Sequence, residues 1–214
     1  MVVVAIDGDP TSTVERVGDI DAVVARLEGG ALAAVGVDIP IGLPSQGPRP
    51  CDVEARTMIG PRRSSVFPAP IRGVLEATTY GDAVARSRAL SGKGLSRQAF
   101  GLLSKVRAVD RIMTPPRQRH LVEVHPEVSF TALSGSPMAS YKKTAAGRAE
   151  RLGALRPVFP DVDRHAHARI GGVGADDVLD AFAVAWSARR WLARAHIQLG
   201  GQLDERGLRM EIVA

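Results

Sequence analysis

Residues 31–43 read ALAAVGVDIPIGL and carry a single charged side chain, Asp38. A continuous apolar run of this kind is typical of a strand that is covered on both faces, as occurs in parallel or mixed sheets. Pro40 has no N–H to donate, so the strand should end close to it. The stretch therefore predicts an α/β fold in which Asp38 lies at the carboxyl end of a buried strand.

Two shorter strands and a helix are expected ahead of this run. Residues 2–6 (VVVAI) and 11–17 (TSTVERV) have the composition and alternation of strands. The turn-forming sequence DGDP at 7–10 between them predicts a hairpin. A helix should follow over residues 19–30, with its first aspartate as the cap and two glycines as its end.

The segment 44–118 shows no strong strand pattern, and we interpret it as a helical insertion within a single domain that spans residues 1–214. The helices expected inside the insertion cover residues 50–58, 79–91 and 96–112. The elements expected after it are a strand over 120–130, a helix over 142–157, a glycine-rich loop over 163–174, a helix over 175–195 and an edge strand over 207–214.

The composition of the 214 residues excludes several classes of protein. Hydrophobic residues make up 45% and charged residues 24%, which is typical of a globular chain. No apolar run approaches the roughly 20 residues of a membrane-spanning helix. The start lacks the pattern of a signal peptide, so we expect a cytoplasmic protein. The lone Cys51 excludes an internal disulfide and a cysteine-rich zinc site.

Carboxylates in unusual positions are the main signal of chemistry. An unpaired carboxylate at Asp38 would cost several kcal/mol if buried, so it needs a metal, a cationic partner or water. Asp177 and Asp180 are three residues apart, which places them on neighbouring rows of one helix face. The helix dipole explains an acid at the start of the helix, but its effect weakens by Asp180. These three residues are therefore candidates for a catalytic metal site.

The stretch LVEVHPEVSF at 121–130 adds further candidates. Glu123 and His125 alternate with valines and should share one side of the expected strand. Glu127 follows just past Pro126. A solvated glutamate and a structural histidine remain the alternatives for Glu123 and His125.

Aspartates without cysteine ligands suit hard cations, and Mg²⁺ and Mn²⁺ prefer carboxylates and water. Two such ions can activate a water and stabilise the leaving oxygen in phosphodiester cleavage. We therefore expect a two-ion site in which Asp38, Asp177, Asp180 and Glu127 are the ligands, while Glu123 and His125 orient water or move protons.

Basic residues indicate a polyanionic partner. The net charge is +5, which favours nucleic acid through counterion release. Arginine forks and serine hydroxyls bind phosphate, so Arg62, Arg63 and Ser64 are candidate contacts. Lys142 and Lys143, just before a helix, are further candidates, although both clusters would equally fit solvated loops. Lys105 is interpreted as a charge on a helix surface.

Seven motifs occur in order along the chain: VGVDIPIGLP, CDVEAR, GPRRSSVFPAP, GKGLSRQAF, EVHPEVSF, KKTAAGR and DDVLDAFA. Together they resemble an uncharacterised bacterial and archaeal family of predicted RNase H-like nucleases, over nearly the whole chain. The resemblance implies a mixed five-stranded sheet with helices on both faces. Its order is three antiparallel strands, a helix, a parallel strand, further helices and strands, and a final acidic helix.

The resemblance also implies roles for individual residues. Asp38 would end the fourth strand as an acidic metal ligand. Asp177 and Asp180 are similar to the paired aspartates on the last helix of Holliday-junction resolvases. His167 resembles, weakly, a loop histidine that assists turnover in ribonucleases H.

The N-terminus departs from the pattern. Such proteins open with a strand that bears an essential aspartate, which Asp7 in AIDGD would supply. However, only two strands then precede the first helix, where the fold requires three. The interpretation we favour makes residues 2–6 and 11–17 the second and third strands, with the first strand absent from this chain and Asp7 in a turn. The unpaired edge that results would favour a homo-oligomer.

Two hypotheses of different class follow. The first is a metal-dependent nuclease that acts on nucleic acid through carboxylate-bound Mg²⁺ or Mn²⁺. The second is a catalytically silent RNase H-like module that binds nucleic acid or a protein partner, which the missing strand favours. A phosphatase or nucleotide hydrolase for small substrates is a third possibility.

Overall fold

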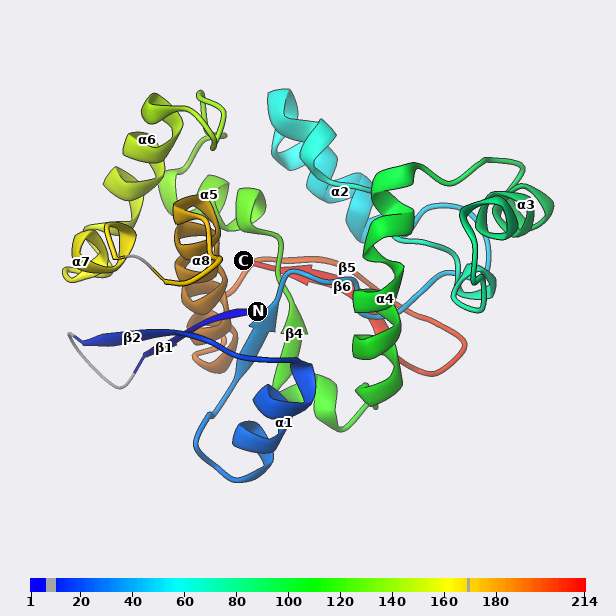
Figure 1. The fold of residues 1–214 in the computed structure, drawn as a ribbon, viewed down its shortest axis with the longest axis horizontal. Coiled ribbons are helices and arrows are strands. Elements are labelled where there is room, and N and C mark those ends of the chain that lie inside the picture. The colour runs from blue at the N-terminus through cyan, green and yellow to red at the C-terminus, as the bar shows by residue number, and fades with distance from the viewer. Residues whose placement is uncertain (7–10, 169) are drawn as a thin grey trace.

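The computed structural model describes residues 1–6, 11–168 and 170–214. Within these residues the chain forms a mixed α/β structure whose strands make three separate two-stranded sheets (Figure 1). The expected α/β class is confirmed. A continuous five-stranded sheet is not formed among the described residues.

The first sheet is the expected N-terminal hairpin. β1 (Val2–Ile6) pairs antiparallel with β2 (Ser12–Arg16), so that Val3 lies opposite Glu15 and Val4 opposite Val14. The DGDP turn, and Asp7 with it, lies outside the described residues. α1 (Ile20–Glu28) follows, and its cap is Asp19, whose side chain accepts a hydrogen bond from the N–H of Ala22.

The second sheet carries the Asp38 stretch. β3 (Val35–Val37) pairs in parallel with β4 (Leu121–Glu123), and both outer residues of β3 are buried. The strand is much shorter than the apolar run 31–43, because the residues on either side of it turn away from the ladder. Asp38 follows β3 directly, as expected.

The predicted strand over 120–130 is wrong beyond Val124. α5 (Pro126–Ser134) begins there, with His125 as its N-cap and Pro126 in its first turn. A proline is favoured at this position because its φ angle suits a helix and its missing N–H needs no partner. The apolar alternation that suggests a strand is instead one buried helix.

The third sheet is a C-terminal hairpin of β5 (Gln198–Leu203) and β6 (Arg209–Val213). An isolated bridge joins Val124 to Val213 in parallel, so β6 lies between β5 and the end of β4. The strand expected over residues 207–214 is found as β6, which pairs with β5 in a two-stranded sheet.

The segment 44–118 is helical and contains no strand, as predicted. Local caps explain the agreement, since Thr79 and Ser96 accept hydrogen bonds from the N–H groups of Asp82 and Ala99. The α-helices here are α2 (Pro50–Met58), α3 (Tyr80–Ser91) and α4 (Arg97–Ile112), and short 3₁₀ helices cover Gly60–Ser65, Arg72–Val74 and Arg117–Arg119.

The last helices are α6 (Ala145–Leu155), α7 (Val162–Ala166) and α8 (Ala175–Leu192). α7 occupies part of the predicted loop over 163–174, which is a second correction. The acidic helix α8 is followed by the β5–β6 hairpin, so it is not the final element of the chain.

The core has two main parts, and most of the buried residues of α8 belong to the second. One part packs α1 and α4 around β3, and the other packs α5, α6 and α7 against α8. Figure 1 shows α8 behind the N-terminal hairpin and beside β3. Among the described residues, no helix combines the length and apolar character needed to cross a membrane.

Candidate functional site

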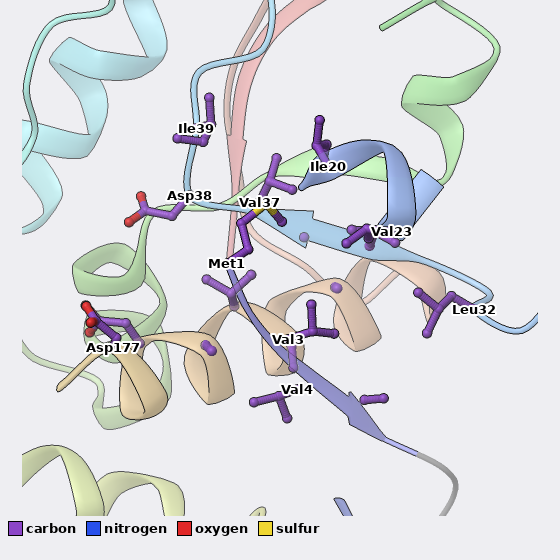
Figure 2. A pocket seen from close by; sticks show the side chains of 18 of the residues that line it. Met1, Val3, Val4, Ile20, Val23, Leu32, Val37, Asp38, Ile39 and Asp177 are labelled. Carbon is purple, nitrogen blue, oxygen red and sulfur yellow. The ribbon is translucent and has the colours of Figure 1, made fainter. Parts of the chain in front are cut away.

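A cavity of about 1090 Å³ opens between β1, β3 and the face of α8 that both strands contact. Asp38, Lys142, Asp177 and Asp180 are among its lining residues. Figure 2 shows Asp38 and Asp177 at the same end of the cavity, with the apolar side chains of β1 and β3 filling the other part of the view. The acidic residues from the strand end and from the helix therefore share one space.

Asp38 lies at the carboxyl end of β3, where the chain leaves the ladder. Asp38 is accessible to solvent, but it faces the cavity. Many protein atoms surround its carboxyl group there. This burial raises the pKa of Asp38, and the positive charges of His125 in its protonated form, of Lys142 and of Lys105 oppose the rise. The carboxylate is therefore reachable by a small ligand but poorly solvated.

The two aspartates of α8 have different surroundings. Asp177 is exposed, and its Oδ2 accepts a hydrogen bond from the N–H of Gly174 at 3.2 Å, which caps the helix. Asp180 is one turn further along, and only 14% of its side chain is exposed. The helix thus places one acid at the mouth of the cavity and one deeper inside.

Lys142, just ahead of α6, is the direct partner of Asp180. Its Nζ donates to Asp180 Oδ2 at 2.7 Å. Burial lowers the pKa of Lys142, but the charges of Asp180, Asp176 and Asp38 outweigh burial and raise it. Lys142 is therefore a firmly protonated cation among carboxylates.

The ion pair does not fully compensate the negative charge. Burial raises the pKa of Asp180 to about 6, the pair with Lys142 opposes the rise, and Asp38 and Glu127 add to it. Asp38 and Glu127 thus act on Asp180 as like charges. Excess negative charge in a recessed space is the electrostatic condition for cation binding.

His125 contributes an unused nitrogen near this cluster. Its Nε2 lies 3.3 Å from the carbonyl oxygen of Ser65. Because a carbonyl only accepts, Nε2 carries the hydrogen, and Nδ1 is then an acceptor. Nδ1 is buried and has no hydrogen-bond partner among the described residues. The histidine can therefore accept a proton or a hydrogen bond at Nδ1.

Glu127 is buried in the first turn of α5. Its Oε1 accepts a hydrogen bond from Arg151, which also donates to the carbonyls of Ser140 and Gly147. Glu127 Oε2 is buried without a partner among the described residues. The arginine thus fixes Glu127 and the segment that carries Lys142 relative to one another.

Glu123 lies in a separate network. Arg49 binds both of its carboxylate oxygens at 2.7 Å, and Glu123 Oε2 also accepts the N–H of Ile41 at 2.6 Å. Arg49 in turn binds Asp52, and all three charged side chains are buried. Glu123 does not line the cavity with Asp38, so its arrangement is that of a buried ion pair.

The expected phosphate contacts are dispersed. Arg62 is buried, donates to the carbonyls of Met138 and Ala139 at 2.9 and 2.7 Å, and stacks on the ring of Tyr141. It therefore supports the loop ahead of Lys142. Arg63, Ser64 and Lys143 are exposed and do not line the cavity, and His167 is an exposed residue at the end of α7 whose Nδ1 lies 2.7 Å from the carbonyl oxygen of Asp163.

Several supporting residues carry no signal in the sequence. Arg49 and Arg151 lie far along the chain from Glu123 and Glu127, and nothing in their local pattern marks them as partners. Lys105 is an exposed charge on α4, as expected, and it also lines the cavity.

The donor set can be tested for a metal. Among the described residues, no three histidine, cysteine or acidic side chains are grouped closely enough to hold one ion. Mg²⁺, however, commonly uses one or two carboxylates and completes its shell with waters and substrate phosphates. The carboxylates of Asp38 and Asp180 fit that smaller requirement.

One comparison with known proteins gives a match. A family model described as a protein of unknown function (DUF429) matches residues 1–202. Neither the curated proteins nor the solved structures contain a match to this chain.

Proposed function

The chain belongs to this family of proteins of unknown function, DUF429, and we propose that it hydrolyses phosphodiester bonds in nucleic acid with Mg²⁺ or Mn²⁺. The observation that carries the proposal is that Asp38 and Asp180 share one recessed cavity and interact as like charges. Perturbed acids in a cavity are characteristic of functional sites, and a divalent cation would relieve their repulsion.

Asp38 and Asp180 would hold the first ion, and Asp177 at the mouth of the cavity would hold a second together with a substrate phosphate. Glu127, in the first turn of α5, would add negative charge close to Asp180. When bound, such ions activate a water and stabilise the leaving oxygen. The protein's part is to hold the carboxylates on two elements, the end of β3 and α8, so that a phosphate fits between them.

Two basic residues and one histidine complete the site. Lys142 would move from Asp180 to a phosphate oxygen when the cation takes over the neutralisation of Asp180. Lys105 lines the same cavity and would add a second phosphate contact. His125 does not line the cavity, so it would accept a proton from behind the lining residues, at its buried and unpaired Nδ1.

We also propose that the fold is RNase H-like. The order of elements supports this: an antiparallel hairpin, a helix, a parallel pair β3–β4, and an acidic helix whose aspartates face the end of β3. The net charge of +5 supports nucleic acid as the substrate, since neutralised phosphates release counterions.

Binding of Mn²⁺, measured by calorimetry, tests the metal site separately from hydrolysis. The chain should bind Mn²⁺, and Asp38→Asn and Asp180→Asn should each weaken binding by at least about tenfold, which corresponds to about 1.4 kcal/mol. Asp21→Asn, on the surface of α1, is the matched control and should bind normally. Equal binding by all four proteins would contradict the proposal.

A second candidate is a module that binds nucleic acid without cleaving it. Two observations favour it: no three-residue metal group exists among the described residues, and Lys142 already neutralises Asp180. Binding of a labelled nucleic acid that persists without cleavage at every Mg²⁺ or Mn²⁺ concentration would establish this alternative.

A further inference from the structure

The cavity has a second property, which concerns the backbone of its two walls. β1 and β3 both line it, yet no hydrogen bond joins them, and each belongs to a different two-stranded sheet. A strand that pairs on one side only has a free row of N–H and C=O groups on its other side. The direction of these free rows can be derived from the hydrogen bonds on the paired sides.

In β1 the free groups belong to Val4 and Ile6. Met1 and Val17 exchange two hydrogen bonds, of 2.9 and 3.0 Å, so they are a bonded pair of the antiparallel ladder. Bonded and non-bonded pairs alternate along such a ladder. In the register of β1 with β2, the N–H and C=O of Val4 and Ile6 therefore point away from β2.

In β3 the free groups belong to Gly36. The N–H of Val35 donates to His120, and the carbonyl of Val37 accepts from Val124, so both valines bond toward β4. Alternate residues of a strand in a parallel ladder bond to opposite sides. The N–H and C=O of Gly36 therefore point away from β4, and Gly36 lines the cavity.

The floor of the cavity is a strip of small side chains. Ala181, Val184, Ala185 and Ala188 lie on one face of α8 and line the space between the two strands. Their spacing of three and four residues places them in one row along the helix. Small residues there leave room above the helix that the neighbouring core elements do not fill.

Charge distinguishes this part of the cavity from its acidic end. The lining residues of β1 and β3, and the small residues of the floor, are all uncharged. The acidic end begins at Asp38, and the other charged lining residues, Arg16, Asp19, Lys105 and Arg189, come from neighbouring segments and not from the two strands. The side chains of Val3 to Ile6 are only partly buried although all are apolar. An uncharged, apolar occupant with a hydrogen-bonding backbone complements these walls, whereas a polyanion does not.

We propose that an extended apolar peptide binds between β1 and β3 as an additional β-strand, hydrogen-bonding to Val4 and Ile6 on one side and to Gly36 on the other. Such a strand would join the hairpin and the β3–β4 pair into one sheet above α8. It would occupy the part of the cavity of about 1090 Å³ that lies between the two strands, away from the acidic end. Strand addition to a free sheet edge is an established mode of peptide recognition.

Amide hydrogen exchange with a defined probe tests this proposal. The probe is a short, end-capped peptide of alternating valine and threonine with lysines at one end for solubility. Without it, the amides of Val4, Ile6 and Gly36 should exchange faster than those of Val3, Ala5 and Val35. With saturating peptide, the first three should slow by at least about tenfold.

The matched control is the same peptide methylated at alternate backbone nitrogens, which keeps its side chains and loses donors on one edge. It should give no protection. Val4→Pro removes an N–H that faces the cavity and does not bond to β2, so it should lose peptide binding, whereas Val4→Thr keeps that N–H and should retain it.

Three results would overturn the proposal. The first is an unchanged exchange rate at saturating peptide, and the second is equal protection by the methylated peptide. The third is protection that rises with protein concentration in the absence of peptide, which would make a second copy of the chain the occupant. None of these readouts depends on hydrolysis, so the proposal stands or fails separately from the nuclease assignment.

Discussion

The ammonium nitrogen of Lys142 lies 2.7 Å from Oδ2 of Asp180, in a cavity that also contains Asp38. A lysine from the segment ahead of α6 thus supplies the positive charge that neutralises the buried acid of α8. The site thus contains one internal cation and several carboxylates. A bound metal ion would compete with Lys142 for Asp180, and a phosphate would compete with Asp180 for Lys142. Both effects can be measured as changes in affinity or in stability.

Lys142→Gln should increase the affinity for Mn²⁺, because it removes the cation that competes for Asp180. The gain should be modest, on the order of 1 kcal/mol, because 39% of the lysine side chain is exposed and its charge is partly screened. Calorimetric titration measures it. Lys143→Gln is the matched control, because Lys143 is exposed and does not line the cavity. Weaker Mn²⁺ binding by Lys142→Gln would show that the lysine supports the metal site.

Asp180→Asn should stabilise the protein at pH 7. The folded pKa of about 6 lies above the ordinary value of 3.8, so the folded state binds the proton more tightly than the unfolded state does. The contribution of Asp180 to stability is therefore most favourable at low pH and falls as the pH rises from 3.8 to 6. At pH 7 the ionised carboxylate costs on the order of 3 kcal/mol, and the amide avoids this cost.

Urea unfolding at a series of pH values measures this effect. Between pH 4 and pH 6 the contribution of Asp180 to the slope of stability against pH should vanish in Asp180→Asn. Asp163→Asn is the control, because the hydrogen bond from Arg156 lowers the pKa of Asp163. Ionised Asp163 therefore stabilises the fold, and its replacement should reduce stability at pH 7 where Asp180→Asn increases it. A variant Asp180→Asn that is less stable than the parent at pH 7 would contradict the account.

Glu123→Gln should destabilise the fold by about 3–5 kcal/mol, because it leaves Arg49 without one partner in a buried network. Any hydrolysis per folded molecule should be retained, since Glu123 lies outside the cavity. Glu205→Gln is the surface control: 53% of that side chain is exposed, and its loss should cost less than about 1 kcal/mol. Selective loss of hydrolysis with stability intact would instead give Glu123 a catalytic role.

Two glycines of α6 should respond to alanine in opposite directions. A methyl group on Gly147 would overlap the carbonyl of Tyr141, next to Lys142, whereas nothing lies within 4 Å of one on Gly153. Gly147→Ala should cost about 1–3 kcal/mol. Gly153→Ala should stabilise by about 0.5–1 kcal/mol through helix propensity. Denaturant titration compares the two, and equal effects would mean that the loop ahead of α6 adapts to the methyl group.

The agreement between sequence and structure is best where local signals act. The helices expected over 50–58, 79–91 and 96–112 are found within one residue, because proline and capping side chains define where they begin. The strand predicted over 120–130 is wrong in its second half because a short apolar run is equally consistent with a buried helix. Pro126, which is favoured in the first turn of a helix, is the signal in the sequence that distinguishes the two.

The candidate site shows the same limit. Inspection of the sequence is enough to find Asp38, a charge at the end of an apolar run. It also finds Asp177 and Asp180, two acids three residues apart on a helix. The partners of the other acids cannot, because Arg49 and Arg151 reach Glu123 and Glu127 only through tertiary packing. Sequence periodicity describes which face a residue occupies, but it does not describe which distant residue meets it there.

The most direct test of the nuclease assignment is cleavage of a labelled panel with Mg²⁺ or Mn²⁺. The panel contains single strands, duplexes, RNA–DNA hybrids and four-way junctions, and free mononucleotides report a small-substrate hydrolase. The chain is compared with Asp38→Asn and with Asp21→Asn, whose aspartate pairs with Arg111 on the surface.

The account predicts metal-dependent cleavage that falls by at least about 100-fold in Asp38→Asn and is unchanged in Asp21→Asn. Circular dichroism of each variant would exclude misfolding as the cause of the loss. Cleavage by Asp38→Asn at the rate of the parent would contradict the central claim that the cavity at the end of β3 is the catalytic site.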